Sequence, residues 1–182
     1  MLGYHRVATV DASAIARAIS AVFPDARTAV DVGSGTGALA AAIRRRGLSV
    51  KACERSRVGR LISRWLHVPT FALDLNDTPP TAIAGPVDIA CCFEVAEHLA
   101  PDLGDRLVAF LCGLGATIIF TAAPPGQGGD GHINEQRQSY WRERFASHGY
   151  TVNINAADGL ATEMAEITAW YLRRNLMVLS RE

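Results

Sequence analysis

Short apolar runs alternate with helical patterns along the chain. The apolar runs predict seven strands, at Thr28–Val32, Leu48–Cys53, Thr70–Leu73, Val87–Phe93, Ala116–Ala122, Tyr150–Ile154 and Leu176–Leu179. The helical patterns predict a first helix capped by Asp11 and ended by Pro24, then helices at Ala38–Arg46, Arg57–Leu66, Pro101–Gly113, Ser139–His148 and Asp158–Arg174. This alternation is typical of stacked βαβ units and predicts an α/β fold with a parallel sheet.

Length and composition are those of a globular protein with one domain. The chain has 182 residues, and domains typically have ~100–200, so we expect one domain over residues 1–182. The 18 basic residues balance the 18 acidic ones, which disfavours a strongly basic nucleic-acid binder. No apolar run approaches the ~20 residues needed to span a bilayer. The four cysteines form no C-x-x-C pair, as expected for buried thiols in a reducing cytosol. We therefore expect a cytoplasmic protein without a membrane segment.

The most informative motif is a glycine turn between the first strand and the helix that follows it. It reads Asp31-Val32-Gly33-Ser34-Gly35-Thr36-Gly37. Glycine accepts positive φ and lets a ligand approach the main chain closely, and the helix N-terminus offers free N–H groups. Glu54 ends the second strand, where an acidic residue can accept hydrogen bonds from both hydroxyls of an adenosine ribose. The turn also fits the loose dinucleotide fingerprint Gly-x-Gly-x-x-Ala.

Asp31 distinguishes between the two nucleotide ligands. Its carboxylate lies two residues before the first glycine, where it would repel the pyrophosphate of a dinucleotide. A ligand that carries an ammonium and a sulfonium group suits this position better. An NAD(P)-dependent reductase remains an alternative, although the chain has no Tyr-x-x-x-Lys pair and Lys51 is its sole lysine. A non-catalytic nucleotide-binding module is the other alternative.

At these residues the chain resembles the class I, Rossmann-like S-adenosylmethionine-dependent methyltransferases. The likeness rests on the glycine turn, on Glu54, on Asp74 after the third strand and on Phe93-Glu94-Val95 after the fourth. It implies a Rossmann-like three-layer sandwich. The sheet would have seven mostly parallel strands, with an antiparallel final strand between the fifth and the sixth. Its implied cofactor-binding residues are Asp31, Gly33, Ser34, Gly35, Thr36, Gly37, Glu54, Asp74, Leu75 and Glu94.

The resemblance also assigns a part of S-adenosylmethionine to each of these positions. Asp31 and the glycine turn would hold the methionine part, and Glu54 the ribose hydroxyls. Asp74 and Leu75 would lie beside the adenine. Glu94 would close the pocket near the methyl-bearing end.

A cluster of acidic residues and histidines is expected at the same edge of the sheet. Glu94, Glu97 and His98 follow the fourth strand and share one face if a helix begins there. His132 lies in the loop after the fifth strand. In one interpretation these four residues bind Mg, Mn, Fe or Zn, which resembles the metal site of small-RNA 2′-O-methyltransferases. In a second, His98 or His132, with Glu97, performs general base catalysis. In a third, purely structural interpretation, Glu97 caps a helix and His98 packs against the sheet.

Two segments are expected to build the acceptor side of the site. Residues 124–138 form a long loop rich in glycine and polar residues, and loops of this length are more often functional than idle. The predicted helix 158–174 is the second lid element. The sequence thus predicts methyl transfer from S-adenosylmethionine to a hydroxyl oxygen of a small metabolite or sugar. Metal-assisted RNA 2′-O-methylation is an alternative, although the neutral net charge disfavours nucleic acid.

Overall fold

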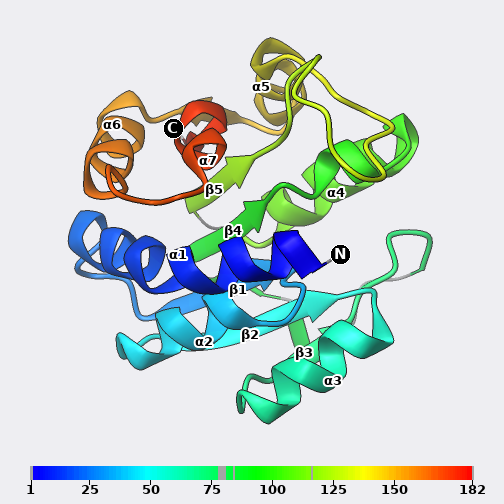
Figure 1. Cartoon of the computed structure of the whole chain (residues 1–182). Helices are drawn as coiled ribbons and strands as arrows, with labels where there is room; N and C mark the ends of the chain where they lie inside the picture. Colours follow the sequence, from blue (N-terminus) through cyan, green and yellow to red (C-terminus); the bar gives the residue numbers. More distant parts are fainter. Residues whose placement is uncertain (1, 78–80, 84, 116, 182) are drawn as a thin grey trace.

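A seven-stranded sheet lies at the centre of the computed structural model, which describes residues 2–77, 81–83, 85–115 and 117–181 (Figure 1). Its strands are β1 Thr28–Val32, β2 Ser49–Glu54, β3 Thr70–Ala72, β4 Ile89–Phe93, β5 Thr117–Thr121, β6 Tyr150–Val152 and β7 Met177–Arg181. The helices are α1 Leu2–Val22, α2 Ala38–Arg45, α3 Arg57–Trp65, α4 Pro101–Gly113, α5 Gln138–Ala146, α6 Ile154–Glu163 and α7 Trp170–Asn175, with short 3-10 turns η1 Thr81–Ile83 and η2 Ala96–His98.

The strand order is β3-β2-β1-β4-β5-β7-β6. β7 is antiparallel to both β5 and β6, and the other neighbouring strands are parallel. This is the sheet that the resemblance implied, with the final strand inserted between the fifth and the sixth. The order reverses between β1 and β4, and open α/β sheets bind ligands at the carboxyl ends of the strands beside such a reversal.

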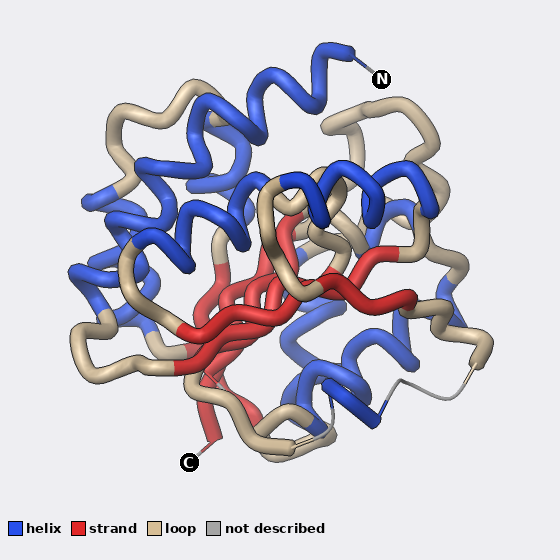
Figure 2. The backbone as a smooth tube through the Cα atoms, turned by 90° about the horizontal axis from the view of Figure 1, so that it is seen from below, coloured by secondary structure: helices blue, strands red, loops and turns tan. Residues whose placement is uncertain are grey.

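Helices cover both faces of the sheet, so the molecule has three layers (Figure 2). On one face α1, α2, α6 and α7 pack over the apolar side chains of one strand register, among them Ala29, Val50 and Ile119. On the other face α4 and α5 bury the alternate register, including Val30 and Phe120, under Trp141 and Phe145. α3 lies against β3 and β2 at the edge of the sheet. The four cysteines are buried free thiols, as predicted.

The first helix differs from the prediction because Asp11 is not its cap. α1 begins at Leu2, and Asp11 lies in its middle with 3% of its surface exposed. The Asp11 carboxylate accepts hydrogen bonds from the Thr168 N–H and hydroxyl and from the Ala169 N–H. It therefore caps the chain just before α7, a partner too distant in sequence for a local pattern to indicate.

The predicted helix Asp158–Arg174 is wrong, since two helices occupy this segment. α6 begins at Ile154, because the Asn153 side chain caps it by accepting from the Ala156 N–H at 3.0 Å. The chain then leaves the helix, and α7 begins at Trp170. The bonds from Asp11 to Thr168 and Ala169 hold the intervening bend and prevent a continuous helix.

The other boundaries agree to within two residues. The strand predicted at Tyr150–Ile154 ends at Val152, where the cap of α6 begins. The predicted strand at 116–122 starts at Ala116, which lies outside the described residues. The loop expected at 124–138 is irregular up to Gln138, the first residue of α5. No helix in the described ranges has the length and apolar character needed to cross a membrane.

We expect Asp11→Ala to lower the free energy of unfolding by about 2–3 kcal/mol, because it leaves the buried Ala169 N–H and the part-buried Thr168 N–H without an acceptor. Asp11→Asn should lose less, since one oxygen acceptor remains. Urea denaturation measures the loss, and Asp158→Ala, on the exposed side of α6, is the matched control. Equal stability of the Asp11 and Asp158 variants would contradict this role.

Candidate active site

The glycine turn connects β1 to α2 in the conformation that its sequence requires. Gly33, Gly35 and Gly37 have φ of 75°, 54° and 76°, which residues with a Cβ rarely adopt. A Cβ at Gly33 would overlap the Val95 side chain, and one at Gly37 would overlap Ser63. The N–H groups of Gly33 and Ser34 donate to the Cys53 carbonyl at 2.9 and 3.0 Å. The turn is therefore fixed between β2 and the chain after β4.

Asp31 is a buried carboxyl at the start of this turn. Its side chain is within the sheet, and within the described residues its Oδ2 has no hydrogen-bond partner. Burial is the main cause that raises its pKa to about 7; a backbone N–H bond from Ala40 lowers the pKa, and the nearby Glu54 charge contributes to the rise. The Ser34 hydroxyl is also buried and unpartnered in the described part of the chain. Buried polar atoms are rarely left unpaired, so these two oxygens suit a ligand that brings hydrogen-bond donors and positive charge.

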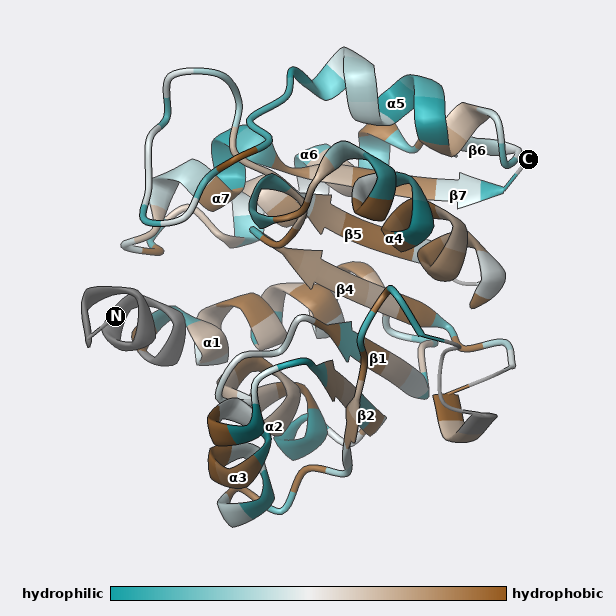
Figure 3. Ribbon diagram, turned by 90° about the vertical axis from the view of Figure 1, so that its right-hand side faces the viewer, coloured by the Kyte–Doolittle hydropathy of each residue, from teal (hydrophilic) through white to brown (hydrophobic). Residues whose placement is uncertain are grey.

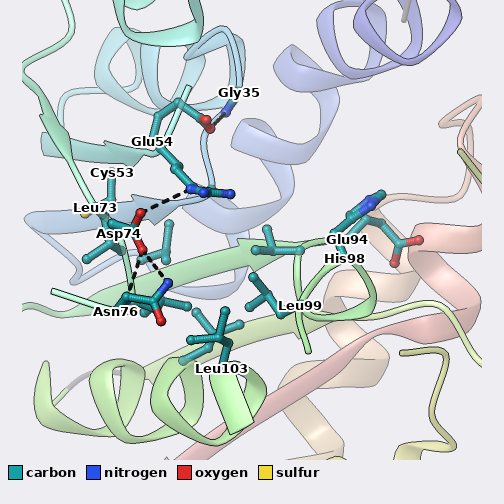
Figure 4. Close-up of a pocket in the computed structure, with 16 residues that line it drawn as sticks. Gly35, Cys53, Glu54, Leu73, Asp74, Asn76, Glu94, His98, Leu99 and Leu103 are labelled. Carbon is teal, nitrogen blue, oxygen red and sulfur yellow. Dashed lines mark hydrogen bonds and ion pairs between the residues drawn. The ribbon is translucent and has the colours of Figure 1, made fainter. Parts of the chain in front are cut away.

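A cavity of about 390 Å³ opens beside the turn, at the carboxyl ends of the strands (Figure 4). Six of the predicted cofactor-binding residues line it: Gly33, Gly35, Glu54, Asp74, Leu75 and Glu94. Apolar side chains from three segments complete the wall: Leu73, Val95, Leu99, Leu103 and Leu107. The other predicted residues, Asp31, Ser34, Thr36 and Gly37, belong to the turn without lining the cavity.

Glu54 and Asp74 lie at one end of this cavity. The Glu54 carboxylate accepts from the Gly35 N–H at 2.8 Å and from the Ser56 N–H at 2.6 Å. Each oxygen keeps a further lone pair for a ligand hydroxyl. Asp74 accepts from the backbone and side chain of Asn76 and pairs with Arg55, and these contacts hold its pKa below its usual range.

Gly59 is a residue of this end that sequence reasoning missed. It is buried on α3, and a Cβ there would lie 2.5 Å from the Gly35 carbonyl oxygen and 2.9 Å from the Glu54 side chain. Glycine within a helix costs ~1 kcal/mol relative to alanine. The sequence therefore contained a signal for Gly59, because an isolated glycine in a helical pattern indicates a close packing contact.

Glu94 and His98 lie at the opposite end of the cavity (Figure 4). Glu94 follows β4 with φ of 51°, so no helix begins there as the shared-face argument assumed. Its backbone N–H donates to the Thr121 hydroxyl. Its carboxylate accepts from Gln127 at 2.8 Å and from Asn175 at 3.2 Å. The end of β4 is thus linked to the glycine-rich loop and to α7.

Glu97 is fully buried in the short turn η2, where the backbone N–H groups of Glu97 and Ala123 and the Glu94 side chain interact with its carboxyl group. Burial, and then the neighbouring charge of Glu94, raise its pKa. α4 is preceded by Ala100 rather than by Glu97, and His98 is exposed. The third interpretation, a helix cap and a packed histidine, therefore does not describe these residues.

Two histidines meet Glu97 at this end of the site. Ligand atoms of Glu97, His98 and His132 all lie within 4.8 Å of one another. His98 Nδ1 is 3.2 Å from the Gly131 carbonyl oxygen, and His132 Nδ1 is 2.9 Å from a Glu135 carboxylate oxygen. Both partners are acceptors, so Nδ1 is the donor in each ring, and in the neutral form of the ring Nε2 is the nitrogen with a lone pair. Glu94, the fourth predicted metal ligand, is not part of this group.

Glu135 organises the loop that carries His132. Its carboxylate accepts from the N–H groups of Gly126 and Gly128 at 2.8 and 2.7 Å, and from His132 Nδ1. The His132 hydrogen bond contributes most to lowering the pKa of Glu135. The loop is held a second time where the N–H groups of Ile133 and Asn134 donate to the Glu97 carbonyl. Asp130 and Glu135 are both acidic residues of this polar loop, and no spacing signature distinguishes them, which is why the sequence did not indicate the role of Glu135.

We expect Glu135→Gln to loosen the loop, because one amide oxygen replaces a carboxylate that accepts three hydrogen bonds. Amide hydrogen exchange at Gly126 and Gly128 should accelerate about tenfold or more, because the free energy of one or two hydrogen bonds is lost. Exchange in the β4 and β5 amides should stay unchanged. Glu143→Gln, on the exposed side of α5, is the control. Unchanged exchange in the Glu135 variant would show that the carboxylate does not order the loop.

No protein-family model and no curated protein matches the sequence. Solved structures do match the fold. The sugar N-methyltransferase KedS8 from Streptoalloteichus sp. is 16% identical with a TM-score of 0.71, over 94% of this chain and 87% of that one. The amino pentose methyltransferase CalS10 from Micromonospora echinaspora is 19% identical with a TM-score of 0.68, over 94% and 90%.

A third similar structure is the small RNA methyltransferase HEN1. It is 17% identical with a TM-score of 0.63, and the match covers 76% of this chain but 22% of that one. Identities this low establish a shared fold and leave the acceptor to be argued from the site. The fold of this chain is that of the class I, Rossmann-like S-adenosylmethionine-dependent methyltransferases.

Proposed function

We propose that the protein transfers a methyl group from S-adenosylmethionine to a hydroxyl oxygen of a small metabolite or sugar. The observation that carries this proposal is the buried Asp31 carboxyl, whose Oδ2 is unpartnered among the described residues at a glycine turn beside a cavity of about 390 Å³. The resemblance at the glycine turn and the methyltransferase fold agree with it. The similar structures named as sugar and amino pentose methyltransferases support a small acceptor.

The residues of the glycine turn and of the adjoining cavity fit this cofactor along its length. Asp31 would neutralise the ammonium group, and Glu54 would accept from the ribose hydroxyls with its remaining lone pairs. Leu75, Leu99 and Leu103 offer apolar surface to the adenine. When bound, the cofactor supplies a methyl group already activated by its sulfonium. The chain then has mainly to position the acceptor, which can contribute ~7–11 kcal/mol of barrier reduction.

His98 and His132 are the proposed proton acceptors. Their Nδ1 atoms are occupied by donation to Gly131 and Glu135, which leaves Nε2 to take the proton from the acceptor hydroxyl. Such general base catalysis contributes typically 10²–10⁴-fold to a rate. Burial raises the pKa of Glu97, so its protonated form is favoured until a cation displaces the proton.

A divalent metal is the second way in which the same residues would serve. Glu97, His98 and His132 would hold it, and histidine ligands typically donate their other ring N–H to a carboxylate or carbonyl, as both do here. The metal would lower the pKa of the acceptor hydroxyl. This arrangement favours metal-assisted 2′-O-methylation of RNA as a second candidate function. Glu94 would contribute only after releasing Gln127 and Asn175.

Cofactor binding can be tested by calorimetry with S-adenosylhomocysteine and, separately, with NADH. We expect the first to bind and the second not. Because the pKa of Asp31 is about 7 in the free protein, roughly half of the molecules hold a proton on it at pH 7. An ammonium group beside it favours the carboxylate, so binding should release up to about half a proton at pH 7 and less at pH 9.

Asp31→Asn should weaken binding and abolish this proton release, measured in buffers of different ionisation enthalpy. Glu163→Gln, exposed at the end of α6, is the control. Tight binding of NADH without binding of S-adenosylhomocysteine would refute the proposed cofactor.

The role of the histidines is tested by His98→Ala and His132→Ala, assayed with labelled methyl donor and a panel of sugars, small alcohols and short RNAs. Each variant should lose about 10²–10⁴-fold in turnover. Titration with Mn²⁺, followed by its electron paramagnetic resonance, distinguishes the two mechanisms. Binding that His132→Ala removes supports a metal, whereas no binding and activity that survives EDTA support a base. Full turnover in both variants would exclude both mechanisms.

A further inference from the structure

α3 packs on the protein through its small residues and exposes its large apolar ones. Gly59 and Ser63 are buried, and they meet the glycine turn at Gly35 and Gly37. Val58, Leu61 and Trp65 are 67%, 56% and 80% exposed, and the neighbouring Ile62 and Leu66 are exposed as well. Figure 3 shows brown, hydrophobic segments on α3 at the end of the molecule next to α2. A surface helix normally buries its apolar stripe, so this face suits an apolar environment outside the chain.

The exposed residues form a continuous stripe along the helix. Val58, Leu61, Ile62 and Trp65 follow the spacing i, i+3, i+4 and i+7, which places them on one side of the helix. We call Val58, Leu61, Ile62, Trp65 and Leu66 the α3 apolar face. Isolated exposed apolar residues are ordinary, whereas a contiguous set with polar surroundings marks an interaction surface.

Basic residues are frequent in the chain around the α3 apolar face. Residues 44–73 contain eight Lys and Arg residues and a single acidic residue, Glu54, although the whole chain has 18 of each; Arg55 is paired with Asp74, which follows this range. Arg44 connects the end of α2 to this region by donating to the His67 carbonyl. Arg57 and Arg64 are exposed on α3, and no salt bridge joins either to an acidic group in the described ranges. Glu54 itself is held by Gly35 and Ser56.

From these observations we propose that α3 docks the protein on the surface of an anionic lipid bilayer. A helix with apolar residues including Trp on one side and arginines beside them lies in the plane of a membrane interface. The arginines would contact lipid phosphates, while the α3 apolar face enters the acyl boundary. This is attachment to a surface, and it needs no helix long enough to span the bilayer. It goes beyond the proposed methyl transfer and does not depend on it.

The small size and the positive charge of this region disfavour a partner protein or a second copy of the chain as its binding partner, and its aliphatic residues disfavour a nucleic acid. A stable protein interface uses about 20–30 residues on each side, and a helix of nine residues offers far fewer. A two-fold dimer through α3 would place the positively charged region of one copy against that of the other. Single-stranded nucleic acid is bound by aromatic stacking and cationic side chains, a role for which exposed Val58, Leu61 and Ile62 are poorly suited.

The test is flotation of the whole protein with vesicles of phosphatidylcholine alone and with vesicles that also contain phosphatidylglycerol. We expect flotation only with the anionic vesicles, and a decrease with added salt. The double variant Leu61→Ser, Trp65→Ser should reduce partitioning roughly tenfold or more. Arg57→Gln with Arg64→Gln should reduce it about 25-fold, since each basic residue at an anionic surface contributes about fivefold. This second pair keeps the test valid if the first does not fold.

Ile154→Ser is the matched control, because Ile154 is 67% exposed on α6, far in sequence from α3, and should float like the wild type. Absence of flotation with anionic vesicles would overturn the proposal, as would equal flotation with both kinds of vesicle. A dimer in sedimentation velocity that Leu61→Ser, Trp65→Ser dissociates would instead make this face an interface between copies. Binding to an RNA oligonucleotide that the serine variant keeps, without flotation, would assign the charge to nucleic acid. Either result would also overturn docking to lipid.

Discussion

The site depends on keeping one carboxyl, Asp31, buried without a complete set of hydrogen bonds. A carboxylate in that position is costly, and burial accordingly raises its pKa. Several features of the fold maintain it. The parallel neighbours β2 and β4 fix the backbone of β1 on both sides, and the glycine turn is held by Cys53 and enclosed by Val95 and Ser63. A buried carboxyl whose Oδ2 has no partner among the described residues is typical of a binding site rather than of a core.

The sequence predicted the ends of those helices and strands that glycine or proline residues mark locally. β1 at Thr28–Val32 and α4 at Pro101–Gly113 lie where they were expected, because a glycine turn and a proline–glycine pair mark their ends. The sequence pattern did not predict contacts between segments that lie far apart in the chain. The break between α6 and α7 depends on Asp11, 157 residues earlier than Thr168. The sequence pattern of residues 158–174 is continuous, so only the tertiary contact distinguishes two helices from one.

The same limit applies to the site. The residues expected to line a cofactor cavity follow the ends of consecutive parallel strands, and topology alone brings Gly33, Glu54, Asp74 and Glu94 to one edge. The acidic and histidine cluster was expected on a helix, yet Glu94 adopts positive φ and Glu97, His98 and His132 meet through a 3-10 turn and a loop. Which nitrogen of each histidine is free follows from Gly131 and Glu135, and neither has a sequence signature.

The close contact of α3 with the glycine turn explains why the inner side of this helix has small residues. Because the Gly35 carbonyl leaves no room for a Cβ at position 59, the inner side of the helix must be small, and it cannot supply the apolar contact that usually anchors a helix. That requirement says nothing about the outer side. Val58, Leu61 and Trp65 contribute little to the core, and polar residues there would preserve the contact with the turn. Their apolar character therefore needs a cause outside the fold, and an anionic lipid surface is one that the neighbouring arginines also fit.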